Sequence, residues 1–174
     1  MLVSSSPVAL RFSAEKYARR ERDAERELRS LRSVFDLSSV FLEIGASDCA
    51  LARRAAGFVE RVYAVDICED TMGRLGGPPN LLRLVHDGVR IPLPHASVDV
   101  AFSRQLVISQ LSGVCHALKD GGRFITFSKG PAAELREAFF EAGFSALRFY
   151  ASGIRIPYPL ARLLDDPFRL VAVK

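Results

Sequence analysis

Two carboxylates and a glycine in the first half of the chain have types and a spacing suited to holding a nucleoside cofactor. An apolar run at 40–44 carries Glu43 and leads into Gly45. A second apolar run at 62–65 ends in Asp66, 23 residues after Glu43. A glycine turn lets a ligand approach the main chain, and an acidic residue at the end of the next strand can accept hydrogen bonds from ribose hydroxyls. This strand–helix–strand step therefore predicts a cradle for a cofactor that contains a nucleoside.

Two further polar side chains follow apolar runs later in the sequence. Asp87 comes after a third run, and Ser103 ends a fourth. Because the carboxyl ends of parallel strands lie at one edge of a sheet, where ligands bind in α/β folds, we expect these residues to lie near Glu43 and Asp66. The prediction is a shared crevice lined from several strand ends.

The elements that must position these residues alternate along the chain. Apolar, β-rich runs predict strands at 40–44, 62–65, 81–85, 98–102, 123–127, 145–150 and 168–173. Helical periodicity and end signals predict helices at 13–35, 48–56, 69–75, 105–118 and 131–142, with a short helical piece at 160–164. This alternation predicts an α/β sandwich with a mostly parallel sheet.

The N-terminal helix has an amphipathic pattern and a charged face. Residues 1–12 are expected to be loosely ordered, 13–35 to form the helix with Ser13 as its cap, and 38–174 to form the core of a single domain. Arginines alternate with acidic residues from 19 to 32, which favours ion pairs along a solvated face. Since the acids largely offset the arginines and no aromatics are interleaved, the run argues against nucleic-acid binding.

Composition narrows the class further. The chain has 174 residues, 49% apolar and 25% charged, with a formal net charge of +4, as expected for one folded domain. No apolar stretch reaches the length of a membrane span and no secretion signal precedes the helix, so we expect a cytoplasmic protein with no membrane partner. Cys49, Cys68 and Cys115 are far apart and the three histidines have no ligand spacing, so neither disulfides nor a metal site are expected.

Several segments resemble those of class I S-adenosylmethionine-dependent methyltransferases, in particular small-molecule enzymes of the methyltransferase type 11 kind. Residues 42–49, Leu-Glu-Ile-Gly-Ala-Ser-Asp-Cys, resemble the acidic-x-Gly-x-Gly-x-Gly loop of that family, with Ser47 and Cys49 where the family has its second and third glycines. Residues 87–103 resemble the third motif block and fourth strand, and 118–124 resemble the turn before the fifth strand.

The resemblance implies a fold, a cofactor and a set of binding residues. The expected fold is a three-layer, Rossmann-like sandwich with a seven-stranded, mostly parallel sheet in the order 3-2-1-4-5-7-6 and helices on both faces. The implied cofactor is S-adenosyl-L-methionine, with S-adenosyl-L-homocysteine as product. The residues implied to bind it are Glu43, Gly45, Ala46, Ser47, Asp66, Ile67, Met72, Asp87, Gly88 and Ser103.

The residues just after the fourth strand narrow the range of acceptors. Arg104 and Gln105 stand where acceptors enter such enzymes, and Arg104 could meet an anionic substrate. No Asn-Pro-Pro-Tyr segment is present there, which disfavours nucleobase and glutamine methylation and leaves a small-molecule acceptor. His95 and Lys129 could be bases by position, but each fits an ordinary surface residue better, so no catalytic residue is assigned. The sequence does not specify the oligomeric state.

Two other functions are compatible with parts of this pattern. Because only one of the three loop glycines is present, the chain could be a binding or scaffold protein that keeps the methyltransferase fold with little or no catalysis. A nicotinamide-dependent oxidoreductase also uses an acidic residue about 20 positions beyond a glycine turn. The Gly-x-Gly-x-x-Gly signature of that class is absent, which disfavours it.

Overall fold

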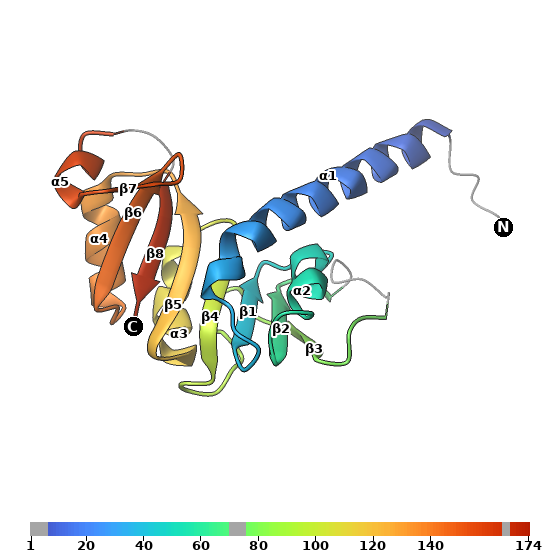
Figure 1. The fold of residues 1–174 in the computed structure, drawn as a ribbon, viewed down its shortest axis with the longest axis horizontal. Coiled ribbons are helices and arrows are strands. Elements are labelled where there is room, and N and C mark those ends of the chain that lie inside the picture. Colours follow the sequence, from blue (N-terminus) through green and yellow to red (C-terminus); the bar gives the residue numbers. More distant parts are fainter. Residues whose placement is uncertain (1–6, 70–75, 165–167) are drawn as a thin grey trace.

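The computed structural model describes residues 7–69, 76–164 and 168–174, with side chains described at Glu15 and from Tyr17 onward (Figure 1). One sheet in this part of the chain has eight strands in the order β3-β2-β1-β4-β5-β8-β6-β7. The strands are β1 (Val40–Ile44), β2 (Arg61–Asp66), β3 (Leu81–Val85), β4 (Val98–Ser103), β5 (Leu118–Ser128), β6 (Ala146–Ala151), β7 (Ile154–Ile156) and β8 (Phe168–Val173). The helices are α1 (Pro7–Leu31), α2 (Ala50–Ala55), α3 (Leu111–Ala117), α4 (Ala132–Glu141) and α5 (Tyr158–Ala161).

The sheet confirms the expected fold class and corrects the strand count. Strands β3, β2, β1, β4 and β5 are parallel neighbours, and β8 runs antiparallel between β5 and β6. The prediction of seven strands was wrong because β7 pairs with β6 at the sheet edge as an eighth. Only three residues long and followed directly by Pro157, β7 has too little alternating pattern to be recognised in the sequence.

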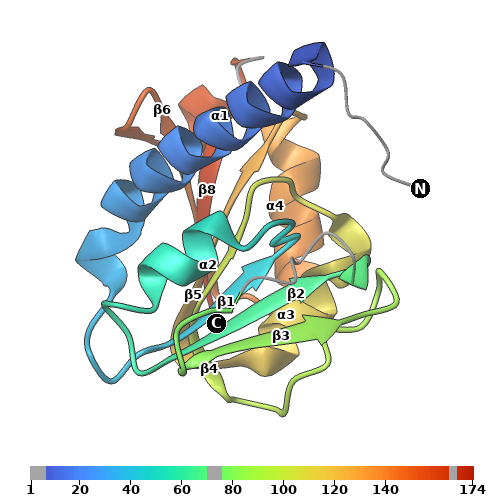
Figure 2. The ribbon, with the colours of Figure 1, turned by 90° about the vertical axis from the view of Figure 1, so that its right-hand side faces the viewer.

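Helices cover both faces of the sheet, which gives the expected three layers (Figures 1 and 2). One core contains buried side chains of α1, α2 and the sheet, including Leu31, Leu51 and Phe41. The other core lies between the sheet and helices α3 and α4. Each face of the central strands is therefore buried, which explains why their sequences are apolar at almost every position.

Helix α1 begins earlier than the sequence suggested. It already includes residues 7–12, which were expected to be loose, and it continues through Ser13, the expected cap. Its last residue is Leu31, and a 3-10 turn follows at Arg32–Val34. The part nearest the N-terminus extends away from the sheet (Figure 1), whereas the C-terminal half packs beside α2.

The helix expected at 105–118 is shorter in the structure. A loop leaves β4, a 3-10 turn covers Ile108–Gln110, and α3 begins only at Leu111. The Leu106 N–H donates to the carbonyl oxygen of Phe127 at 3.2 Å, which holds the loop against β5 in place of a helical turn. The helix expected at 69–75 lies almost entirely outside the described residues. The loop after β4 is thus left to line the site described below.

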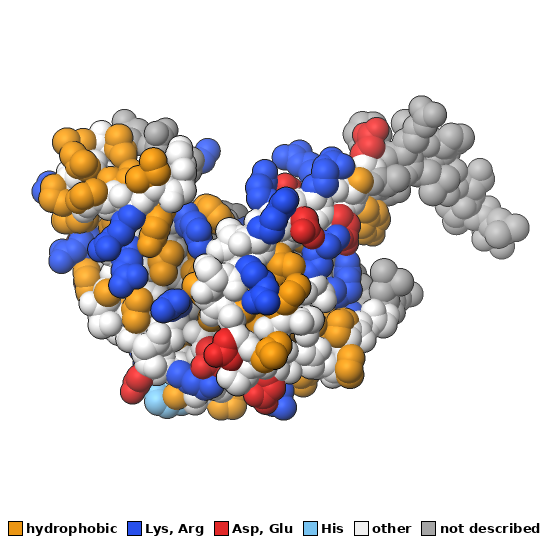
Figure 3. Space-filling model, in the orientation of Figure 1, with side chains coloured by type: hydrophobic (Ala, Val, Ile, Leu, Met, Phe, Trp, Pro, Cys, Tyr) orange, Lys and Arg blue, Asp and Glu red, His pale blue; other side chains and the backbone are white. Residues whose placement is uncertain are grey.

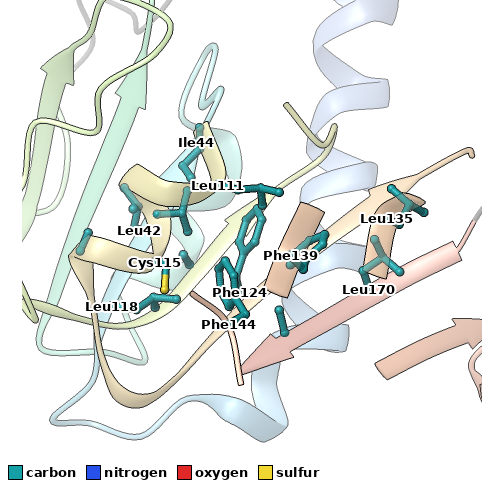
Figure 4. Close-up of a cluster of buried hydrophobic side chains, with 14 of the residues drawn as sticks. Leu42, Ile44, Leu111, Cys115, Leu118, Phe124, Leu135, Phe139, Phe144 and Leu170 are labelled. Atoms are coloured by element: carbon teal, nitrogen blue, oxygen red, sulfur yellow. The ribbon is translucent and has the colours of Figure 1, made fainter. Parts of the chain in front are cut away.

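Aromatic packing anchors the core beneath α3 and α4 (Figure 4). The Phe139 ring lies 6.1 Å from that of Phe124 and 5.2 Å from that of Phe144, centroid to centroid. Phe139 and Phe144 come from α4 and the turn that follows it, while Phe124 belongs to β5. Their contact fixes the helix over the sheet.

We expect Phe139→Ala to lower the free energy of unfolding by about 3–5 kcal/mol, because a fully buried ring leaves a cavity. The neighbouring Phe140, which is 37% exposed, is the matched control, and Phe140→Ala should cost less than about 1 kcal/mol. Urea unfolding of both variants measures the difference. Equal losses would show that the ring stack does not anchor α4.

Candidate functional site

The loop after β1 follows an unusual backbone path. Gly45, Ser47 and Cys49 have positive φ angles of 71°, 49° and 57°. These are the three positions at which the family resemblance expects glycine. Side chains with a Cβ rarely adopt this conformation, at a cost of roughly 1–2 kcal/mol each. The loop therefore takes a left-handed conformation at alternate residues, although two of the three are not glycine.

Hydrogen bonds to β2 hold this loop in place. The N–H groups of Gly45 and Ala46 both donate to the carbonyl oxygen of Val65, at 2.8 and 3.1 Å. The Ser47 N–H donates to Oδ2 of Asp66 at 2.8 Å. The other oxygen of Asp66 accepts from the N–H of Cys68 at 3.1 Å. Asp66 thus joins the loop after β1 to the turn after β2, and a carboxylate has lone pairs for further donors.

Glu43 is a fully buried carboxylate beneath the loop. Its Oε2 accepts from the Ala52 N–H in the first turn of α2 at 2.9 Å, and its Oε1 lies 3.0 Å from Nη1 of Arg104. Arg104 also donates two hydrogen bonds to Glu27 of α1, with Nε and Nη2 at 2.9 and 2.7 Å from the two carboxylate oxygens. This network, Glu27–Arg104–Glu43, ties α1, the loop after β4 and the tip of β1 together.

Two carboxyl groups share one guanidinium in this network, and burial dominates their protonation. Burial raises the pKa of Glu43 to about 8, although Arg104 acts in the opposite direction. Burial also raises the pKa of Glu27. The protonated, neutral form of Glu43 is therefore favoured at neutral pH.

A cavity of about 350 Å³ opens at the carboxyl ends of β1, β2 and β4. Parallel strands β1 and β4 are sheet neighbours whose chain connections leave in opposite directions, which is where α/β folds bind ligands. The residues that line the cavity are Ile44, Gly45, Asp66, Ile67, His86, Ser103, Arg104, Gln105, Val107 and Gln110.

Six of the residues predicted from the sequence line this cavity, namely Gly45, Asp66, Ile67, Ser103, Arg104 and Gln105. Ile67 is 67% exposed, an open apolar surface at the rim. The Ser103 hydroxyl donates to the carbonyl oxygen of Gln105 at 2.7 Å, which shapes the loop after β4.

The other predicted residues lie around the cavity or elsewhere. Glu43 is buried beneath it, and Ala46, Ser47 and Gly88 are not part of its lining. Asp87 is exposed, and its Oδ1 accepts from the N–H groups of Val89 and Arg90 at 2.9 and 2.7 Å. These hydrogen bonds from the backbone lower the pKa of Asp87, and they hold its carboxylate against the turn that follows it. Met72 lies outside the described residues.

Four lining residues were not predicted from the sequence: the apolar Ile44 and Val107, and the polar His86 and Gln110. His86 is 9% exposed, and its Nδ1 accepts from the Gly88 N–H at 3.2 Å, which assigns the ring proton to Nε2. Gln110 donates from Nε2 to the carbonyl oxygen of Gly88 at 2.8 Å. His86 directly precedes the Asp87 motif and could have been considered, whereas Gln110 lies 22 residues from Gly88 and no local spacing indicates it.

A second cavity of about 410 Å³ adjoins the first. Both are lined by Arg104 and Gln105, and Phe127 and Lys129 belong to the second. The other candidate base, His95, lies before β4 at the opposite sheet edge, with its ring 4.8 Å from that of His116. Among the described side chains, no group of three or more His, Cys, Asp or Glu residues is arranged to hold a metal ion.

Comparisons with known proteins place this geometry in a recognised fold. No protein-family model and no curated protein sequence matches the chain. Among solved structures, the chain is similar to one from the complex between the Haloferax volcanii Trm112 methyltransferase activator and a methyltransferase. The two chains are 17% identical with a TM-score of 0.66, and the match covers 93% of this chain and 96% of that one. An S-adenosylmethionine-dependent methyltransferase from Aquifex aeolicus has 18% identity, a TM-score of 0.62, and coverage of 86% and 88%.

A third similar structure contains a bound ligand. Haemonchus contortus phosphoethanolamine N-methyltransferase 2 in complex with S-adenosyl-L-methionine is 16% identical, with a TM-score of 0.65, and the match covers 86% of this chain and 52% of that one. At these identities the likeness establishes the fold: the chain has the class I methyltransferase fold, with one additional edge strand.

No helix in the described part of the chain is long and apolar enough to cross a membrane.

We expect Ser47→Gly to raise the free energy of unfolding by about 0.5–1 kcal/mol, because relief of the left-handed strain exceeds the added entropy of the unfolded chain. Ser47→Ala is the matched control, since it removes the hydroxyl and keeps the Cβ, and should give no gain. Urea unfolding measures both. A loss of stability in the glycine variant would show that the serine side chain holds the loop.

The protonation of Glu43 predicts a pH dependence. In the unfolded chain this group ionises near its ordinary value of 4.5, and in the folded protein near 8, so its contribution to stability falls as pH rises through that window. Glu43→Gln removes the titration and keeps an acceptor for the Ala52 N–H. Relative to the parent, the variant should gain stability with rising pH by up to about 1.4 kcal/mol per pH unit.

Urea unfolding of both proteins between about pH 5.5 and 8.5 tests this expectation, because titrating groups remote from Glu43 contribute equally to both. A stability difference that is constant with pH would mean that Glu43 is already ionised in the folded protein.

Proposed function

We propose that the chain is an S-adenosylmethionine-dependent methyltransferase that acts on a small-molecule acceptor. The observation that carries the proposal is the cradle itself: a loop with left-handed residues at 45, 47 and 49, tied to the Asp66 carboxylate, at the mouth of a cavity between β1 and β4. The similarity of the fold to that of methyltransferases supports the same assignment.

The residues around the cavity fit the parts of the proposed cofactor. Asp66 would accept hydrogen bonds from ribose hydroxyls, and the exposed Ile67 would contact the adenine ring. The main chain at Gly45 would lie against the methionine part. His86 and Gln110 add polar groups at the same cavity, so they become candidates for contact with the base in addition to Asp87 and Gly88.

When bound, S-adenosyl-L-methionine supplies a methyl group on a sulfonium, which is already a strong electrophile. The protein then has to orient the acceptor toward the methyl group and to exclude water. Arg104 and Gln105, shared by both cavities, would separate the cofactor from the acceptor. Lys129 lines the acceptor side and is the candidate there for contact with an anionic group, since three nitrogens of Arg104 already bind carboxyl groups.

A second candidate is a non-catalytic protein that keeps the fold for binding. It is favoured by the two side chains on the left-handed loop and by the engagement of Arg104 with Glu27 and Glu43. A ligand that needs this arginine would first have to displace a carboxyl group. Cofactor affinity distinguishes the two candidates.

Isothermal titration with S-adenosyl-L-methionine and S-adenosyl-L-homocysteine is the test. We expect saturable binding to the parent, and Asp66→Asn should weaken it about 10- to 100-fold, because hydrogen bonds to a charged group are worth about 1.5–3 kcal/mol. Asp120 on β5 is fully exposed and lies outside both cavities, so Asp120→Asn is the matched control and should change the dissociation constant less than about threefold.

No saturable heat with either compound at millimolar concentration would favour the non-catalytic protein. An unchanged dissociation constant in Asp66→Asn would show that this carboxylate does not hold the ribose.

A further inference from the structure

One face of the outer half of the sheet is a row of alternating aromatic and arginine side chains. Phe127 on β5 pairs with Arg169 on β8, Arg169 pairs with Tyr150 on β6, and Tyr150 pairs with Arg155 on β7. Side chains of residues that are directly paired across strands point to the same face of a sheet. The four side chains therefore lie side by side across four strands.

Two more arginines belong to this face. Side chains alternate along a strand, so residues separated by an even number of positions share a face. Arg148 lies two residues before Tyr150 on β6, and Arg123 lies four residues before Phe127 on β5. Arg123, Arg148 and Arg155 are exposed, and Phe127 is 37% exposed, which is high for a phenylalanine in a sheet. We call this surface the arginine–aromatic face.

The arrangement of the layers leaves this face open. Helices α1 and α2 pack over the half of the sheet that contains β1 and β4, while α4 lies behind the outer strands (Figure 1). In the same orientation, the surface over the outer strands shows several Lys and Arg side chains with apolar groups between them (Figure 3). The outer half thus exposes Arg123, Arg148 and Arg155. Tyr150 and Arg169 lie half-buried beside α1, where Nη2 of Arg169 donates to the Ser30 carbonyl oxygen at 3.2 Å.

The arginines of this face lack carboxylate partners. Within the described part of the chain, none of Arg123, Arg148, Arg155 and Arg169 forms an ion pair, whereas Arg53, Arg54 and Arg104 each bind glutamates of α1. Within the described residues, the buried Nε of Arg169 has no hydrogen-bond partner. The guanidinium carbon of Arg169 lies 5.8 Å from the ring centroid of Tyr150. The positive charge of this face is therefore not neutralised internally.

A groove of about 390 Å³ runs along one side of the face. Arg26, Glu27 and Ser30 of α1 line one side, Ser152 and Gly153 of the β6–β7 turn line the other, and Phe127, Tyr150 and Arg169 complete the lining. Glu27 is the one acidic residue among these, and Arg104 already binds it. The groove is of a size that takes a flat ring.

We infer that the arginine–aromatic face binds single-stranded nucleic acid. Strands are about 4.8 Å apart and rise about 3.3 Å per residue, so the arginines spread over roughly 14 Å by 13 Å. Charges so far apart cannot converge on one small anion, but they match a chain of regularly spaced phosphates. Phe127 and Tyr150 between them provide surfaces on which unpaired bases stack, as on other single-strand-binding sheets.

This inference does not depend on methyl transfer. It also differs from the expectation based on the sequence, which judged nucleic-acid binding from the charged run of α1 alone. The arginine–aromatic face is assembled from four strands between residues 123 and 169 and contains no basic run. Phe127 lines both the second cavity, of about 410 Å³, and the groove, so the arginine–aromatic face adjoins that cavity at Phe127.

Fluorescence anisotropy with labelled single-stranded oligo(U) and oligo(dT) tests the inference on the full chain. We expect saturable binding at about 50 mM salt, with a slope of log K against log salt of about −2 to −3, since each single-strand phosphate contributes about −0.7. The double variant Arg148→Ala with Arg155→Ala should reduce that slope by about 1.4. Tyr150→Leu should weaken binding at least about fivefold and leave the slope unchanged.

The matched control is Arg22→Ala with Arg29→Ala, which removes the same charge from exposed positions of α1 and should leave affinity and slope nearly unchanged. Arg148→Lys with Arg155→Lys should keep the parental salt slope, and circular dichroism checks that each variant is folded. The inference is overturned by the absence of saturable binding, by equal effects of the two alanine pairs, or by an unaltered affinity in Tyr150→Leu. Binding to phosphatidylserine vesicles but not to oligonucleotides would overturn it in favour of a membrane surface.

Discussion

The contact between the fully buried Glu43 and the partly exposed Arg104 is the interaction on which the candidate site depends. Glu43 accepts from the first turn of α2 and meets Arg104 from the loop after β4, and Arg104 reaches across to Glu27 on α1. The loop, the short helix, the long helix and the cavity wall are therefore held by one set of hydrogen bonds. Loss of Arg104 would leave Oε1 of the buried Glu43 without its hydrogen bond, which typically costs about 1–3 kcal/mol and more for a charged group. These contacts occupy three nitrogens of Arg104, so its role lies in shaping the cavity rather than in binding an acceptor.

The loop above this contact holds a left-handed backbone at two residues that are not glycine. Ser47 and Cys49 hold left-handed conformations because both ends of the loop are fixed, by Val65 and Asp66 on one side and by α2 on the other. Strain of this kind persists only where the surroundings determine it, and it concentrates at ligand sites. The conformation thus supports the proposed cofactor cradle more strongly than the presence of one glycine in the sequence does.

The sequence predicted what depends on local pattern and missed what depends on tertiary contact. Apolar runs indicated the strands from β1 to β6 and β8, because each central strand is buried on both faces, and the resemblance supplied their order. The short strand β7, the true start of α1 and the loop before α3 depend on edge pairing and packing that periodicity does not record. At the site, Gly45, Asp66 and Ser103 were found from strand ends, whereas Gln110 reaches the cavity from a distant 3-10 turn. The arginine–aromatic face requires the register of four strands and is invisible in the linear sequence.

We propose that the β1 loop and the end of β2 together hold an adenosyl group. Hydrogen–deuterium exchange with and without S-adenosyl-L-homocysteine tests the location of binding directly. We expect slower exchange in peptides that cover residues 43–53 and 64–69, and unchanged exchange in peptides from the β6–β7 hairpin. Protection confined to other segments, or none in the β1 loop at saturating ligand, would contradict it.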